Sequence, residues 1–155
     1  MAPVISFILP AYNVDKYIEA CVLSIETQDL PMDQYEVIIV NDGSTDSTLE
    51  VIQRLALLYS NIRVINQQNQ GVSIARNNGF KITRGTYIWF VDPDDIITKN
   101  CLGALVSTMD NLNLEALTVG PSLAFLHDFS CKLDLYDNIS PVYNGLDYCT
   151  IKKID

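Results

Sequence analysis

Tyr87-Ile88-Trp89-Phe90-Val91 is a run of five large apolar residues, and Asp92-Pro93-Asp94-Asp95 follows it directly. Such a run is typical of a strand that is buried on both faces of a sheet. Three carboxylates within four residues repel one another unless a positive charge lies among them, and a divalent metal, which prefers oxygen ligands, is the natural candidate. Asp and Pro are also common in turns, so the stretch alone leaves a plain turn open as well.

Apolar strands alternate with amphipathic helices on either side of this stretch. The pattern predicts strands at 4–9, 35–40, 62–65, 87–91 and 114–119. One helix is expected from Val14, and a second after an N-cap at Asp46 or Ser47, where Ser47 with Glu50 fits a capping box. Further helices are expected along 72–82 and from a cap at Thr98 to about 109. This order predicts an α/β fold with a doubly wound, mostly parallel sheet and helices on both faces.

The bulk composition describes an acidic globular chain of one domain. It has 155 residues, of which 48% are hydrophobic and 19% are charged. The net charge of −9 and the lack of any Lys and Arg block argue against nucleic-acid binding, which needs a basic surface. No apolar stretch reaches the ~20 residues of a membrane span, and the N-terminus lacks a signal-peptide pattern.

The cysteines and the single histidine give no sign of a metal or disulfide framework. Cysteines stand at 21, 101, 131 and 149, without a Cys-x-x-Cys pair. Buried thiols in a reducing cytosol are therefore the expected state, which predicts a cytoplasmic protein. His127 is expected to be structural.

Polar residues follow each of the first four predicted strands, at 10–13, 41–46, 66–71 and 92–95, and Arg76 lies on the helix after the third set. The carboxyl ends of parallel strands meet at one edge of a sheet, where such sheets bind ligands. We therefore expect these residues to converge on one metal-assisted site. After Pro121 the periodicity weakens, and an extended segment with one or two short strands is expected.

Several of these side chains suit a nucleotide. Asp42 can accept hydrogen bonds from a ribose hydroxyl or a base N–H, or it can be a turn residue. Tyr12 can lie against a planar base, or it can be a packed loop aromatic. Arg76 either pairs with a loop carboxylate or reaches a phosphate or base. Asn77 and Asn78 can orient neighbouring loops.

Four motifs in this order resemble the family 2 glycosyltransferases, which have the GT-A fold. They are residues 8–13 (ILPAYN), 40–46 (VNDGSTD), 71–77 (GVSIARN) and 90–95 (FVDPDD), and the resemblance covers about 3–110. It implies a sugar-nucleotide-binding domain at 1–120. Residues 121–155 would then begin an acceptor-side segment that the chain's end cuts short.

The resemblance also implies roles for single residues. A nucleoside-diphosphate sugar, with UDP the expected nucleotide, would bind at Pro10, Tyr12, Asn13, Asp42, Arg76 and Asp92. Mn²⁺ or Mg²⁺ would bind at Asp94, with Asp92 and Asp95 as further ligands. The ion would neutralise the charge that grows on the departing diphosphate.

The implied reaction is inverting transfer of a sugar to a hydroxyl of a carbohydrate or lipid-linked acceptor. It would serve polysaccharide or glycoconjugate biosynthesis, in the cytoplasm or at the inner membrane face. The family's general base usually lies in a Glu-Asp or similar acidic pair in the second half of the catalytic domain. No Glu-Asp pair follows residue 110, and the candidates by type alone are Asp128, Asp134, Asp137 and Asp147.

Two other classes of function stay open. One is a nucleotide-sugar-binding domain without catalysis, because the usual base is missing from the pattern. The other is a phosphotransferase of the haloacid dehalogenase type, which also carries Asp-x-Asp after a strand. That chemistry normally has its acids on an early strand, whereas here they follow the fourth.

Overall fold

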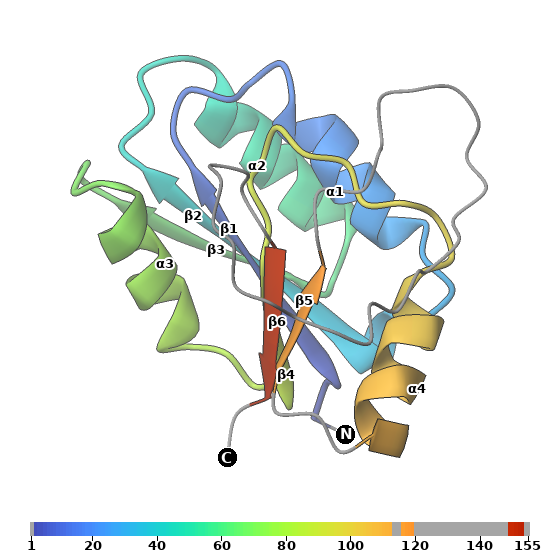
Figure 1. Cartoon of the computed structure of the whole chain (residues 1–155). Helices are drawn as coiled ribbons and strands as arrows, with labels where there is room; N and C mark the ends of the chain where they lie inside the picture. Colours follow the sequence, from blue (N-terminus) through green and yellow to red (C-terminus); the bar gives the residue numbers. More distant parts are fainter. Residues whose placement is uncertain (1, 113–115, 120–148, 154–155) are drawn as a thin grey trace.

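A computed structural model describes residues 2–112, 116–119 and 149–153. Six strands form one sheet in the order β3-β2-β1-β4-β6-β5 (Figure 1). The first four run parallel, and β6 lies antiparallel between β4 and β5. The strands are β1 (Ile5–Ala11), β2 (Tyr35–Asp42), β3 (Ile62–Gln67), β4 (Tyr87–Phe90), β5 (Ala116–Val119) and β6 (Cys149–Lys153). The prediction of a mostly parallel α/β sheet is confirmed.

Helices cover both faces of the sheet. They are α1 (Ile18–Glu26), α2 (Thr48–Leu58), α3 (Val72–Phe80) and α4 (Leu102–Leu112), with a short 3₁₀ turn, η1 (Met32–Gln34). Because side chains alternate along a strand, Val37 and Ile39 of β2 join the core under α1, α2 and α4. Ile38 and Val40 point the other way and pack with Ala75 of α3. Among the helices of the described residues, α3 is the one on this face of the sheet (Figure 1).

The apolar run that precedes the three acids is an interior strand, as predicted. Tyr87, Ile88 and Trp89 are all buried, and β4 lies between β1 and β6. The Trp89 ring packs against Phe7 of β1 with 5.5 Å between the ring centroids. Each such side chain stabilises the fold by roughly 1.5–3 kcal/mol when fully buried, which explains why the run contains no polar residue.

A close approach of backbone to side chain sets the position of α3 on the sheet. A Cβ atom at Gly79 would lie 2.6 Å from Cγ2 of Ile8 and 3.2 Å from Cγ2 of Val40. Only a residue without a side chain lets the helix lie this close to β1 and β2. Gly79 therefore fixes how near α3 can come to the strands below it.

Of the two cap residues considered for α2, Asp46 is confirmed and Ser47 is wrong, and the predicted start of the next helix at Thr98 is also wrong. Ser47 has φ −77° and ψ 9°, outside the extended region that a capping residue needs, and its side chain makes no cap hydrogen bond with α2. Instead the Thr48 backbone N–H donates to Asp46 Oδ1 at 3.0 Å. Thr98 does not begin α4, because left-handed Asn100 (φ 57°) interrupts the chain before the helix starts at Leu102.

The C-terminal part of the chain adds one strand to the described sheet. The expectation of a short strand beyond Pro121 is met by β6, which pairs with both β4 and β5. Residues 120–148, which include His127, Cys131 and all four candidate bases, lie outside the described residues. Across the described ranges, no helix is both long and apolar enough to cross a membrane.

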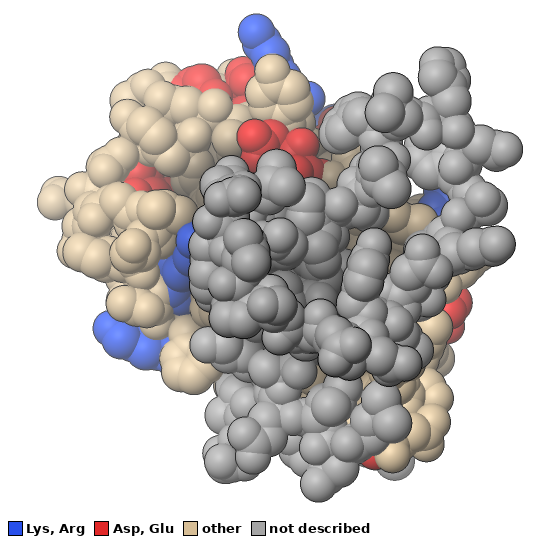
Figure 2. Space-filling view, in the orientation of Figure 1, with Lys and Arg blue, Asp and Glu red and all other residues tan. Residues whose placement is uncertain are grey.

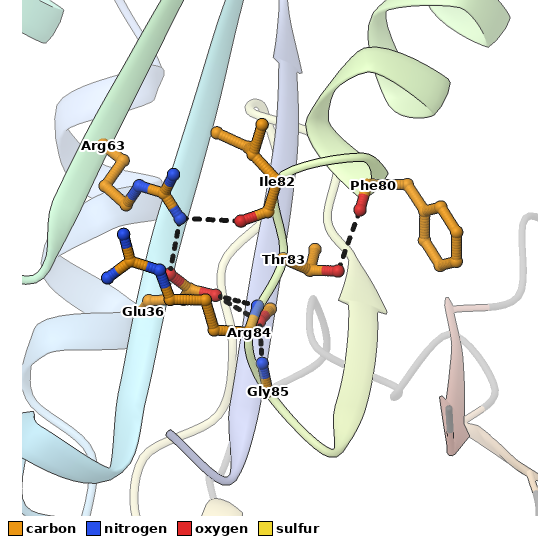
Figure 3. Close-up of polar contacts among 8 residues, drawn as sticks. Glu36, Arg63, Phe80, Ile82, Thr83, Arg84 and Gly85 are labelled. Atoms are coloured by element: carbon orange, nitrogen blue, oxygen red, sulfur yellow. Dashed lines mark hydrogen bonds and ion pairs between the residues drawn. The ribbon is translucent and has the colours of Figure 1, made fainter. Parts of the chain in front are cut away.

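A buried carboxylate near the start of β2 fixes the connection from α3 to β4 (Figure 3). Glu36 Oε1 accepts hydrogen bonds from Ser6 Oγ at 2.7 Å and from the Arg84 backbone N–H at 2.6 Å. Its Oε2 pairs with Arg63 Nη1 at 3.1 Å, and the same nitrogen donates to the Ile82 carbonyl at 2.7 Å. These contacts hold the end of α3 against the strands.

Candidate functional site

A pocket of about 280 Å³ opens at the carboxyl ends of β1 and β2, beside the start of α3. This volume is near the lower limit of small-molecule pockets, roughly 300 Å³, so the pocket can hold a base-sized part of a larger ligand. Its lining residues are Pro10, Ala11, Tyr12, Asp42, Asn69, Gly71, Val72 and Ala75. Three of the predicted nucleotide-binding residues therefore share one pocket.

Asp42 has a fixed carboxylate on the floor of this pocket. It is only 3% exposed. Its Oδ1 accepts hydrogen bonds from Gln67 Nε2 at 2.7 Å and from the Gln70 backbone N–H at 2.9 Å, and its Oδ2 accepts one from the Gly71 backbone N–H at 2.8 Å. Asp42 thus ties the end of β2 to the loop between β3 and α3, and it also faces the pocket.

A short chain of side chains sets the orientation of Gln67. Asn78 Nδ2 donates to Gln67 Oε1 at 2.8 Å, and Lys81 Nζ donates to Asn78 Oδ1 at 2.9 Å. Asn78 therefore orients the last residue of β3. The sequence pattern does not single out Gln67, because its role depends on partners from β2 and α3 and not on its local neighbours.

The loops after β2 and β3 touch at Gly43. Its φ of 70° lies in the left-handed region, and a Cβ atom there would lie 2.7 Å from the backbone nitrogen of Asn69. Glycine is required here both by the backbone conformation and by the contact. The contact brings Asn69, which the sequence does not single out, to the wall of the pocket.

Asn13 joins the loops after β1 and β2. Its Oδ1 accepts a hydrogen bond from the Thr45 backbone N–H at 2.8 Å, and its own N–H donates to Ser44 Oγ at 3.1 Å. It is not among the residues that line the pocket. In the structure Asn13 therefore fixes the shape of the pocket rim.

Arg76 and Asp92 lie side by side at the same edge of the sheet, next to the pocket. Arg76 Nη2 and Asp92 Oδ1 are 2.7 Å apart, and each side chain is 37% exposed. Of the two roles considered for Arg76, pairing with a loop carboxylate is the one present. A pair this exposed stabilises the fold by about 1 kcal/mol or less, so a ligand can replace one partner at low cost.

The acidic loop after β4 is a turn that presents carboxylates to solvent. The Asp95 backbone N–H donates to the Asp92 carbonyl at 2.9 Å, and Pro93 is buried beneath the turn. The side chains of Asp94 and Asp95 are exposed. Figure 2 shows Asp and Glu side chains gathered at the upper end of the molecule, the end to which the parallel strands point in Figure 1.

The donor atoms of this loop fit a metal that is shared with a phosphate. Within the residues that the structure describes, no three Asp, Glu, His or Cys side chains converge into a complete metal site. Mg²⁺ commonly takes only one or two carboxylates and completes its shell with phosphate oxygens and water. Carboxylates also suit Mn²⁺, and exposed Asp94 and Asp95 offer such oxygens.

Sequence comparison finds glycosyltransferases among the relatives of this chain. The family model described as "Glycosyl transferase family 2" matches residues 6–147. The uncharacterized glycosyltransferase EpsJ of Bacillus subtilis is 41% identical over 120 residues, which cover 77% of this chain and 34% of EpsJ.

Solved structures of similar fold carry sugar nucleotides. The S. aureus TarS 1-349 structure in complex with UDP-GlcNAc superposes with a TM-score of 0.68 at 32% identity, covering 73% of this chain and 33% of that one. Mannosyltransferase PcManGT from Pyrobaculum calidifontis, in complex with GDP-Man and Mn²⁺, gives a TM-score of 0.68 at 25% identity, covering 75% and 35%. These neighbours confirm the predicted GT-A fold. The chain spans about a third of the length of each of these relatives.

Proposed function

The chain belongs to glycosyl transferase family 2, and on that premise we propose that it carries the donor side of a metal-dependent, inverting glycosyltransferase. The donor would be a nucleoside-diphosphate sugar, with a UDP-sugar the first choice. The acceptor would be a carbohydrate or lipid-linked hydroxyl in polysaccharide or glycoconjugate biosynthesis. The observation that carries the proposal is that the Asp42 pocket and the Asp92–Asp95 turn open at one edge of the sheet, at the ends of neighbouring strands.

The nucleoside would occupy the pocket beside Asp42. A carboxylate has about four acceptor positions, and Asp42 uses three of them within the protein. The fourth can accept a base N–H or a ribose hydroxyl without any loss of the internal bonds. Tyr12 is 48% exposed at the same pocket, and its ring can cover a planar base.

The diphosphate would lie between the start of α3 and Arg76. The first N–H groups of a helix favour an anion, and α3 begins at the pocket wall formed by Gly71 and Val72. Arg76 is one turn further along α3 and is held by Asp92. A phosphate oxygen can take the place of that carboxylate on the guanidinium, because both anions accept its charge-assisted hydrogen bonds.

Asp94, with Asp92 and Asp95, would hold Mn²⁺ or Mg²⁺. When bound, the ion neutralises negative charge on the departing nucleoside diphosphate. The exposed oxygens of the turn support this assignment, and so does the Mn²⁺ in the PcManGT complex. The turn itself, closed by the Asp95 N–H and stiffened by Pro93, would keep the carboxylates in place before the donor arrives.

The acceptor hydroxyl would attack the anomeric carbon from the face opposite the diphosphate, which inverts the configuration. A carboxylate would remove the hydroxyl proton as the new bond forms. The candidates Asp128, Asp134, Asp137 and Asp147 lie outside the described residues, so we assign no base. We propose a cytoplasmic location, in solution or at the inner membrane face.

A second candidate is nucleotide-sugar binding without transfer. The observation that favours it is the Asp42 pocket itself, which needs no general base in order to bind a nucleotide. The haloacid dehalogenase alternative is not carried further, because the family match covers residues 6–147.

Calorimetric titration of the chain with UDP, GDP and dTDP, each with and without Mn²⁺, tests the proposed donor site. We expect saturable binding of one nucleotide that Mn²⁺ strengthens, and a loss of that binding in Asp42→Asn. The absence of binding for all three nucleotides would overturn the proposal. Sugar transfer from the matching donor then separates the enzyme from the binding domain.

A further inference from the structure

The segment that follows the acidic turn has no regular secondary structure of its own. Between the end of β4 at Phe90 and the start of α4 at Leu102, the chain forms two turns and otherwise runs without helix or strand. Figure 1 shows this segment, in yellow, passing over α1 before it reaches α4. Since regular backbone hydrogen bonds do not fix it, other groups must satisfy its N–H and C=O groups.

Side chains of α1 and the residues just after it supply these partners. Ser24 Oγ accepts a hydrogen bond from the Ile97 backbone N–H at 3.0 Å. Gln28 Nε2 donates to the Thr98 carbonyl at 2.9 Å, and Gln28 Oε1 accepts from the Cys101 backbone N–H at 3.1 Å. Ser24 and Gln28 therefore hold the segment at three successive points.

The start of the acidic turn also forms a hydrogen bond with α1. Cys21 Sγ donates to the Asp92 carbonyl at 3.7 Å, one helical turn before Ser24. Asp94 and Asp95 lie between this contact and the Ile97 contact, so α1 holds both ends of the acidic turn. The carboxylates themselves remain exposed between the two attachments.

These attachments are shielded from water. Ser24, Ile97 and Cys101 are each less than a tenth exposed. A buried N–H that loses its acceptor keeps the full cost of desolvation, so a change at Ser24 or Gln28 would force the segment to move in order to find new partners. Movement there shifts Asp94 and Asp95, because only one residue separates Asp95 from Ile97.

We propose that Ser24 and Gln28 are positioning residues for the metal and diphosphate: they fix the segment after the acidic turn and thereby the direction of the Asp94 and Asp95 carboxylates. This inference rests on the proposed function of the turn. If Ser24 and Gln28 had a purely structural role, their hydrogen bonds would contribute to the stability of the fold and would not affect metal-dependent binding. The two roles differ in what they predict for metal-dependent binding.

Gln28→Met and Ser24→Ala remove the hydrogen bonds with little change in size. Thr27→Val is the matched control, because the exposed Thr27 hydroxyl donates only to the Leu23 carbonyl within α1. Amide hydrogen exchange on the whole chain is the first measurement. The Ile97 amide should exchange at least about ten-fold faster in Ser24→Ala, and the Cys101 amide in Gln28→Met, with both unchanged in the control.

The second measurement is calorimetric titration with UDP, with and without Mn²⁺. Loss of a group that orients a metal ligand typically weakens metal affinity by about 10- to 100-fold. We expect the strengthening of UDP binding by Mn²⁺ to fall by about ten-fold in both variants, while metal-free UDP affinity stays within about two-fold of the wild type. The control should match the wild type in both conditions.

Two contrary results have different meanings. If the wild type shows Mn²⁺-dependent UDP binding and both variants keep it in full, the positioning role is overturned and the proposed function stands. If the wild type shows no Mn²⁺ dependence, the metal role of the turn fails, and the inference fails with it. Should Gln28→Met not fold, Gln28→Glu removes the donor to Thr98 and retains the acceptor for Cys101. The Cys101 amide should then keep its slow exchange, and the Mn²⁺ dependence of UDP binding is read as for Gln28→Met.

Discussion

Arg76 of α3 and Asp92 in the turn after β4 form an ion pair, with 2.7 Å between Nη2 and Oδ1. The pair joins the helix that borders the pocket to the turn that carries the acids. It places one positive charge between two groups of negative charge, the protein's own carboxylates and the diphosphate of the proposed donor. It is therefore the contact at which donor binding and the acidic turn meet.

Replacement of Arg76 by Gln should weaken nucleoside-diphosphate binding by about ten-fold or more, because a charge-assisted hydrogen bond contributes roughly 1.5–3 kcal/mol. The free energy of unfolding should change by only about 1 kcal/mol, since the Arg76–Asp92 pair is partly exposed. Calorimetry and urea denaturation measure the two effects.

Arg54→Gln is the matched control for Arg76→Gln. It removes another exposed ion pair, Arg54 Nη2 to Glu19 Oε2 at 2.8 Å, on helices α2 and α1. Its nucleotide affinity should equal that of the wild type. An equal loss of affinity in both variants would mean that Arg76 acts through net charge and not through contact with the donor.

Asp94→Asn should remove the strengthening of nucleotide binding by Mn²⁺ and leave the Tm unchanged. The Asp94 side chain is exposed, so the fold does not depend on it, whereas an amide is a much weaker ligand than a carboxylate for a hard cation. Titration with and without Mn²⁺ checks the first expectation, and thermal unfolding checks the second. Asp33→Asn, at an exposed site in η1, is the control; full Mn²⁺ dependence in Asp94→Asn would remove Asp94 from the metal site.

Gly79→Ala should destabilise the fold by about 1–3 kcal/mol, even though alanine favours helices, because the new Cβ would lie 2.6 Å from Cγ2 of Ile8. Gly103→Ala in α4 is the paired control. A Cβ atom there would meet the Asp29 carboxylate at 2.8 Å. The end of that side chain can move aside, and the change then costs the exposed hydrogen bond from the Gly103 N–H to Asp29 Oδ1 at 3.0 Å but does not strain the core. Urea denaturation of both variants measures the difference, and equal stabilities would show that α3 can shift on the sheet.

The stability of the fold should depend on Tyr87 at alkaline pH. Burial and the hydrogen bond to Asp110 raise the pKa of Tyr87 to about 12. In the unfolded chain a tyrosine ionises near about pH 10. The stabilisation is therefore complete below about pH 10 and is lost as the pH rises through about 12.

Urea denaturation of the wild type and Tyr87→Phe at about pH 9 and about pH 11 tests this dependence. The wild type should lose more stability than the variant between the two values, because phenylalanine has no proton to lose. Ultraviolet difference absorbance should show one fewer late-titrating tyrosine in the variant. Equal pH dependence would mean that Tyr87 ionises normally in the folded protein.

The sequence predicts the parallel part of the sheet well because buried strands are recognisable as continuous runs of apolar residues. The strand at 87–90 is apolar along its whole length, and β1 and β2 are mostly apolar, because these strands are buried. The convergence of Tyr12 and Asp42 at one edge follows from the parallel order of the strands, and the structure places both at one pocket. Local composition and topology are enough for these predictions.

Other features depend on contacts between distant segments and leave no local pattern. The Asp42–Gln67 and Gln28–Cys101 hydrogen bonds join residues on different elements, and neither Gln67 nor Gln28 stands out by type or spacing. The choice between Asp46 and Ser47 at the start of α2 was set by the backbone angles of one residue. The place of β6 between β4 and β5 likewise depends on pairing between distant segments.

Strand β2 carries a buried carboxylate near each end, and both act on α3. Asp42 accepts hydrogen bonds from the two residues just before that helix, and Glu36 holds Arg84 and, through Arg63, Ile82 just after it. The helix is thus held at its two ends by a single strand. In the proposed donor site, Arg76, midway along it, would exchange Asp92 for a phosphate by rotation of its own side chain. Capture of the donor at this point would accordingly be a rotamer change on a rigid support.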